Sequence, residues 1–162
     1  MPRYLYLLRH AQSADKQIGQ ADKERTLTPI GLKEARAVGI FFKEKSLIPE
    51  LIITSSALRA KTTSKAVAEI LNYEAEKIVA EDCLYEATIS TFSQILSQLD
   101  HQINSVLFVG HNPVLTFFAD SIINQQNSFR PAEVLVLKSE ATTWKDIQMG
   151  NTELLAKFHP IV

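Results

Sequence analysis

Short apolar runs alternate with amphipathic segments along most of this chain, and this pattern predicts alternating strands and helices. The runs that predict strands lie at 3–8, 51–54, 77–80, 106–109 and 134–137. The segments with apolar residues at helical spacing lie at 28–45, 57–71, 90–102 and 112–123. Two further short strands, at 144–149 and 154–158, are expected to form a hairpin at one edge of the sheet.

Residues at the expected helix ends support this assignment. Thr28-Pro29 and Asn112-Pro113 each place a capping residue before a proline at the first helical position. Ser55 and Ser56 are candidate caps of the second helix, and Asn72 can end it. The strand–helix order and the continuously apolar strands predict a mainly parallel sheet with helices on both faces. The expected fold is therefore a three-layer α/β/α domain over residues 1–162.

Composition narrows the functional classes. The 162 residues are 46% hydrophobic and 22% charged, and the net charge of -1 gives no basic footprint for nucleic acid. No stretch reaches the ~20 apolar residues of a membrane span, and no signal peptide opens the chain. The single cysteine, Cys83, excludes a disulfide within the chain and a zinc site built from cysteines. We therefore expect a cytoplasmic monomer without nucleic-acid or membrane partners.

Reactive side chains follow the expected strands. Arg9 and His10 come after the first strand, Arg59 lies in the first turn of the second helix, Glu86 follows the third strand and His111 follows the fourth. Strand ends of a parallel sheet share one edge, where ligands bind. Arg9 and His10 are expected in a loop there, outside the core. Each residue alone has an ordinary structural explanation, but their coincidence at one edge favours a shared site.

These residue types suit phosphoryl transfer. Two arginines can clamp phosphoryl oxygens with forked hydrogen bonds, and His111, if protonated, adds another donor. A neutral His10 can attack phosphorus and form a phosphohistidine that water then hydrolyses. Glu86 is placed to protonate the leaving group and then to activate water. No cluster resembles a metal-ligand set, so neither metal nor cofactor is expected.

Four segments together resemble the histidine phosphatase superfamily, which includes the cofactor-dependent phosphoglycerate mutases. They are Leu8–Ala11, Leu27–Gly31, Ser55–Thr62 and Val109–Pro113. The resemblance implies a phosphoglycerate mutase-like fold and a phosphate pocket. It makes His10 the phosphorylated nucleophile and Arg9, Arg59 and His111 the pocket residues. Ala11 stands where the family usually has glycine, as in its short bacterial branch.

The resemblance also bears on the substrate. Arg25 looks like a recurring feature of the short branch and, with Ser13, is a candidate for substrate binding; Glu86 falls where the family's general acid usually lies. The chain between Arg59 and His111 has no room for the cap domain of the mutases, so the site should be open. A chain without the cap domain is most similar to short bacterial phosphohistidine phosphatases of the SixA type. A small phosphate ester as substrate and a non-catalytic phosphate-binding module are the alternatives.

Overall fold

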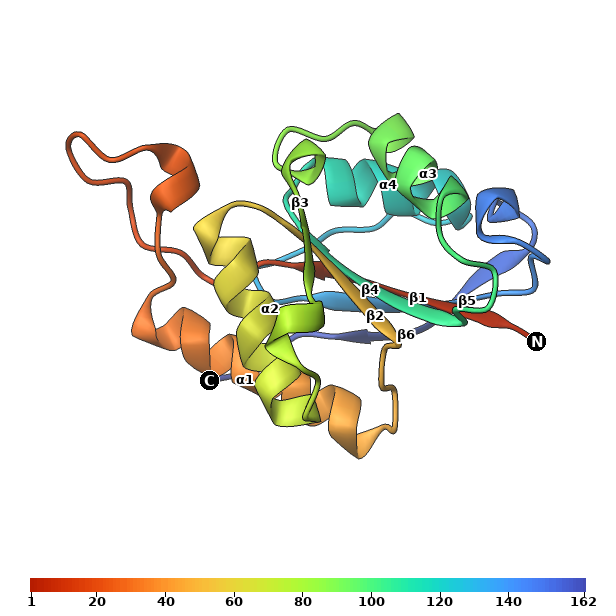
Figure 1. Cartoon of the computed structure of the whole chain (residues 1–162), viewed down its shortest axis with the longest axis horizontal. Helices are drawn as coiled ribbons and strands as arrows, with labels where there is room; N and C mark the ends of the chain where they lie inside the picture. The colour runs from red at the N-terminus through yellow and green to blue at the C-terminus, as the bar shows by residue number, and fades with distance from the viewer.

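A six-stranded sheet lies between two layers of helices in the computed structural model, which describes residues 1–162 (Figure 1). The strands are β1 (Arg3–Arg9), β2 (Leu51–Ser55), β3 (Val79–Glu81), β4 (Ser105–Gly110), β5 (Val134–Ser139) and β6 (Thr152–Phe158). The helices are α1 (Pro29–Glu44), α2 (Leu58–Leu71), α3 (Ile89–Ser97) and α4 (Val114–Ile122). Short 3-10 turns are η1 (Asp22–Glu24), η2 (Ala75–Lys77), η3 (Asp82–Leu84) and η4 (Trp144–Asp146).

The sheet is mainly parallel, as the sequence predicts. Its strand order is β3-β2-β4-β1-β5-β6. The first four strands of that order run parallel, β5 is antiparallel to β1, and β6 is antiparallel to β5. The carboxyl ends of β1, β2 and β4 therefore meet at one edge. At that edge Arg9 pairs with Gly110, so the residues that follow β1 and β4 leave the sheet side by side.

The two faces of the sheet carry separate cores. Helices α1 and α2 lie on one face and α3 and α4 on the other (Figure 1). Side chains alternate across β1, so that Leu5 and Leu7 join the α3–α4 core while Tyr6 and Leu8 join the α1–α2 core. This burial on both sides explains why the central strands are continuously apolar. The three-layer α/β/α prediction is confirmed.

Helix starts follow the sequence at one site and depart from it at another. The Thr28 hydroxyl accepts a hydrogen bond from the Gly31 amide at 2.9 Å and caps α1, as expected. The expected Asn112 cap is wrong, because α4 begins one residue later with Pro113 at the capping position, after a cis peptide bond. The Asn112 amide group instead donates to the Phe129 carbonyl and accepts from Thr116.

The predictions for the chain's last part and for α3 need correction. Residues 144–149 form η4 and the loop after it instead of a strand, because Trp144 is buried and its indole donates to the Ile103 carbonyl at 2.8 Å. The terminal hairpin therefore joins β5 to β6. Helix α3 ends at Ser97 and not near 102, since the following turns lead the chain into β4.

Close packing of α1 depends on two glycines. A Cβ on Gly39 would lie 2.8 Å from the Ile70 Cβ of α2, and one on Gly31 would collide with the Gln12 carbonyl.

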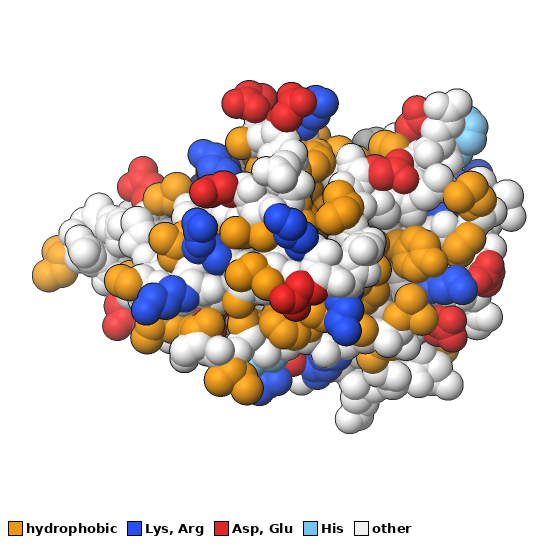
Figure 2. Space-filling view, turned by 90° about the horizontal axis from the view of Figure 1, so that it is seen from below, with side chains coloured by type: hydrophobic (Ala, Val, Ile, Leu, Met, Phe, Trp, Pro, Cys, Tyr) orange, Lys and Arg blue, Asp and Glu red, His pale blue; other side chains and the backbone are white.

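Charged side chains of both signs are interspersed on the face in Figure 2, in keeping with the small net charge. None of the helices is both long and apolar enough to cross a membrane.

Candidate active site

A cavity of about 370 Å³ opens at the carboxyl edge of the parallel strands. It brings together all seven residues that the sequence singles out. Its lining consists of Arg9, His10, Ser13, Asp22, Arg25, Arg59, Tyr85, Glu86, His111 and Asn112. Ten residues from five separate stretches of chain therefore meet in one polar hollow. Its size is at the lower end of that of small-molecule sites.

His10 is more buried than the sequence suggests. His10 follows β1 in a loop, as expected, but it is only 8% exposed, so the expectation that it lies outside the core is wrong. Arg9 is half-buried and is the last residue of β1, so it does not lie in that loop. The segment before β5 contacts this part of the chain, because the Ala132 amide donates to the carbonyls of Arg9 and His10. His10 is also tied to β4, because its amide donates to the Gly110 carbonyl at 3.1 Å. The backbone of His10 is thus held from two sides, by Ala132 and by Gly110.

The hydrogen bond of the His10 ring defines its tautomer. Nδ1 lies 2.8 Å from the Ala11 carbonyl oxygen, which can only accept. The proton therefore sits on Nδ1, and Nε2 keeps a free lone pair. Burial lowers the pKa of His10 to about 4, and the positive charges of Arg59 and Arg9 act in the same direction. At pH 7 the ring is a neutral nucleophile.

His111 lies beside His10, with 5.1 Å between the ring centroids. Its Nε2 is 2.8 Å from the Ser55 hydroxyl, which also accepts a hydrogen bond from the Ala57 amide. Burial and then the neighbouring His10 lower the pKa of His111 to about 3. The resting ring is therefore neutral and offers one N–H, so it is not the protonated donor considered from the sequence. Ser55 is a ring partner, and Ala57, not Ser55 or Ser56, is the capping residue of α2.

Two arginines supply the positive charge of the cavity. Arg9 donates to the Phe129 carbonyl at 2.9 Å, and Arg59, in the first turn of α2, is 7% exposed. The Nε atoms of both guanidinium groups are buried without a hydrogen-bond partner. An unpaired buried donor is costly, and a charged one more so. Both guanidinium groups line the cavity, so an anion bound there would lie beside two positive charges.

Asp22 is the residue that sequence reasoning missed. Its carboxylate and carbonyl accept from Arg59 at 3.1 and 2.9 Å, and its carboxylate also accepts from Arg25 at 3.2 Å. The Tyr85 hydroxyl donates to it at 2.6 Å. These bonds, that from Tyr85 foremost, hold the pKa of Asp22 far below its usual value. In the sequence, only the three-residue spacing between Asp22 and Arg25, which suits a local ion pair, points to Asp22.

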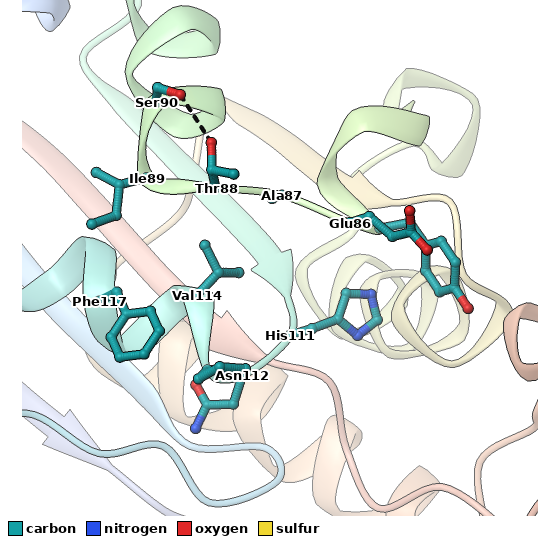
Figure 3. A pocket seen from close by; sticks show the side chains of 11 residues that line it. Glu86, Ala87, Thr88, Ile89, Ser90, His111, Asn112, Val114 and Phe117 are labelled. Carbon is teal, nitrogen blue, oxygen red and sulfur yellow. Dashed lines mark hydrogen bonds between the residues drawn. The ribbon is translucent and has the colours of Figure 1, made fainter.

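The other candidates lie around this centre. Arg25 donates to the Ser13 hydroxyl at 2.9 Å, so these two form one wall of the cavity. Glu86 is exposed at the opposite rim. There the cavity meets a second, larger groove, and Figure 3 shows Glu86 and His111 at one end of that groove and Phe117 at the other. No group of three or more His, Cys, Asp or Glu side chains is close enough to hold a metal ion.

Comparison with known proteins agrees with this geometry. The family model of the histidine phosphatase superfamily (branch 1) matches residues 5–103. A structure of a putative phosphohistidine phosphatase SixA from Nakamurella multipartita superimposes with a TM-score of 0.87 at 22% identity, covering 100% of this chain and 98% of the other. The corresponding protein from Agrobacterium tumefaciens gives 0.84 at 26% identity, covering 99% of each chain.

A third structure, the protein histidine phosphatase SixA in complex with tungstate, gives a TM-score of 0.82 at 19% identity and covers 96% of each chain. The family match spans more than half of the sequence, and the similarity in fold extends over the whole of it. By these matches the chain belongs to the histidine phosphatase superfamily, branch 1, and is a phosphatase of the hydrolase class.

Proposed function

We propose that this protein removes phosphate from phosphohistidine on a protein, through a phosphohistidine intermediate on His10 and without a metal ion. The observation that carries the proposal is the state of His10. Its ring is neutral, its Nε2 is free, and it lines a cavity with two guanidinium groups whose Nε donors are unpaired. A nucleophile beside two guanidinium groups that can hold phosphoryl oxygens is the arrangement that phosphoryl transfer needs.

In the first step, Nε2 of His10 attacks phosphorus while the bond from phosphorus to the substrate nitrogen breaks. The leaving imidazole takes up a proton, for which Glu86 at the rim is the donor. Arg9, Arg59 and the N–H of His111 hold the three non-bridging oxygens. The dianion also raises the pKa of His111, so that this ring becomes a stronger donor as substrate binds.

In the second step, water attacks the phosphorylated His10. The new P–O bond forms as the P–N bond breaks, Glu86 accepts the proton of the water, and the ring returns to its neutral state. Inorganic phosphate is the product. The charge on the phosphoryl oxygens is balanced by side chains of this chain in both steps.

The bond chemistry, the open cavity and the structural relatives each support phosphohistidine as the substrate. Transfer from one imidazole to another exchanges like bonds, so the first step is nearly balanced and depends little on a strong general acid. Only η2, β3, η3 and α3 with their loops lie between α2 and β4, which leaves no cap domain over the cavity. Three of the structures with the same fold are named as SixA phosphatases of histidine or phosphohistidine, one of them with the phosphate-like oxyanion tungstate.

The test uses a phosphorylated histidine-containing phosphotransfer domain with wild type and His10→Ala, each with and without chelator. We expect metal-independent hydrolysis by wild type only, and acid-labile, alkali-stable phosphate on His10 after a rapid quench. Hydrolysis that needs added metal, or that persists in His10→Ala, would contradict the proposal. Absence of both hydrolysis and trapped phosphate would make a phosphate-binding module the better description.

A small phosphate ester is the second candidate, and the cavity volume of about 370 Å³ favours it, since such a molecule would fit. A panel of phospho-metabolites separates the two. A kcat/KM above ~10⁴ M⁻¹s⁻¹ on one of them, the lower end of ordinary enzymes, would favour the ester.

A further inference from the structure

An apolar groove of about 690 Å³ continues from the phosphate cavity along the start of α4 (Figure 3). The two hollows share Tyr85, Glu86, His111 and Asn112 as a common wall. A substrate whose phosphoryl group lies in the cavity must extend outward from it. The groove gives that outward part a direct path along the protein surface.

The far part of the groove is built from apolar side chains. Its walls there are Ala87, Ile89, Pro113, Val114 and Phe117. Phe117 is 53% exposed and Ile89 is 40% exposed, so both present apolar surface to solvent. The nearby hydroxyls of Thr88 and Ser90 lie 2.9 Å apart and can satisfy each other. Little polar surface would have to be desolvated when an apolar group enters.

The charges around the groove also favour an uncharged, apolar ligand. Glu86 is the only carboxylate that lines it, and neither lysine nor arginine does. A substrate with a second phosphate or a carboxylate beyond the reacting phosphoryl group would therefore meet no cation here, and a negative charge at the entrance. An uncharged, apolar group gains from burial instead. The groove selects against polyanionic metabolites.

The spacing of the wall residues suggests what kind of apolar group it is. Val114 and Phe117 are three positions apart on α4 and form one apolar stripe that starts beside His111 (Figure 3). The stripe is about one helical turn long, or ~5 Å. On a substrate helix, an apolar residue one turn from the phosphohistidine lies at the same spacing.

Given the proposed function, on which this step rests, we propose that the groove binds an apolar side chain of the substrate protein, one helical turn from its phosphohistidine. Phe117 and Ile89 are then specificity residues. They decide which phosphohistidine is dephosphorylated and leave the transfer of phosphate itself to the cavity.

The test is a specificity cycle with two helical peptides of identical sequence around one phosphohistidine. One peptide has leucine four positions before and after that residue, and the other has serine at both places. Phosphoimidazole serves as a third substrate that cannot reach the groove. Wild type should prefer the leucine peptide in kcat/KM by about tenfold, since burying most of a leucine side chain contributes enough for that ratio.

Phe117→Ser should reduce this preference to about twofold or less and leave phosphoimidazole turnover within about twofold of wild type. The matched control is Ile40→Ser, because Ile40 is 46% exposed on α1 and does not line the groove. It should keep the full preference. An equal preference in wild type and Phe117→Ser would overturn the docking proposal, as would no preference in a wild type that hydrolyses phosphoimidazole. A wild type inactive on all three substrates would overturn the proposed function itself.

Discussion

Acid should destabilise this protein between pH 6.5 and pH 4, because the fold buries two neutral imidazoles. The pKa of His10 falls from 6.5 to about 4 on folding and that of His111 to about 3, in both cases mainly through burial. Between these values the unfolded chain binds protons that the folded chain does not. The free energy of unfolding therefore rises with pH across this window. The loss of unfolding free energy is absent above the pKa that the histidines have in the unfolded chain. It grows as the pH falls toward their pKa in the folded protein.

The size of the effect follows from the shift. A pKa of about 4 in the folded state and 6.5 in the unfolded state means that His10 costs about 2 kcal/mol between pH 7 and pH 4.5. His111 adds a cost of the same order, and the two rings share part of it because each is the other's neighbour. Asp22 contributes little here, since carboxylates titrate mainly below this range.

The assay is urea unfolding of wild type and His10→Gln at pH 7 and pH 4.5. Glutamine keeps an N–H donor near the Ala11 carbonyl but does not titrate. Wild type should lose about 2 kcal/mol more than His10→Gln on acidification. His101→Gln is the matched control, because that histidine side chain is 79% exposed. It should follow wild type.

The refuting result is equal acid sensitivity of wild type and His10→Gln. It would mean that His10 titrates at its ordinary pKa and is protonated well above pH 4. The neutral nucleophile on which the proposed mechanism depends would then be present only near and above neutral pH.

Three further substitutions test the surroundings of the site. Ser55→Ala removes the hydroxyl partner of His111, and we expect kcat to fall about tenfold with little change in the urea midpoint; an unchanged kcat would contradict the positioning role. Asp22→Asn removes a negative charge from the cavity but keeps an acceptor, so inhibition by inorganic phosphate should tighten about fivefold, and weaker inhibition would show that the carboxylate mainly orders the cradle. Gly31→Ala places a methyl group against the Gln12 carbonyl and should cost ~1–3 kcal/mol in urea unfolding, whereas a neutral effect would mean that this loop yields freely.

The features that the sequence predicts correctly depend on residues close together in the chain or on the order of strands and helices. The cap of α1 needs only Thr28 and the two or three residues after it, and it is found where expected. The central strands are apolar on both faces because helices cover both, and the continuously apolar runs in the sequence show this. Arg59 and His111 follow β2 and β4, so the topology of a parallel sheet is enough to place them at one edge.

What the sequence misses depends on contacts between distant segments. Asp22 is important only because the loop before α1 folds back onto Arg59, and no local pattern reveals that contact. His10 is buried where its backbone carbonyl accepts from the Ala132 amide, far along the chain. Residues 144–149 have the composition of a strand, but Trp144 gains more by entering the core beside α3 than by joining an edge.

Because β1 pairs with β4, the active site can form only after the polypeptide has been synthesised through β4. The two imidazoles each follow a strand whose last residues, Arg9 and Gly110, are locked opposite one another. A slip by one position would move one ring by ~3.3 Å relative to the other and turn side chains to the wrong face of the sheet. A nascent chain that ends before β4 thus cannot assemble the cavity, however well its first helices have formed. Turnover during refolding would report completion of the sheet's centre, a late and long-range event.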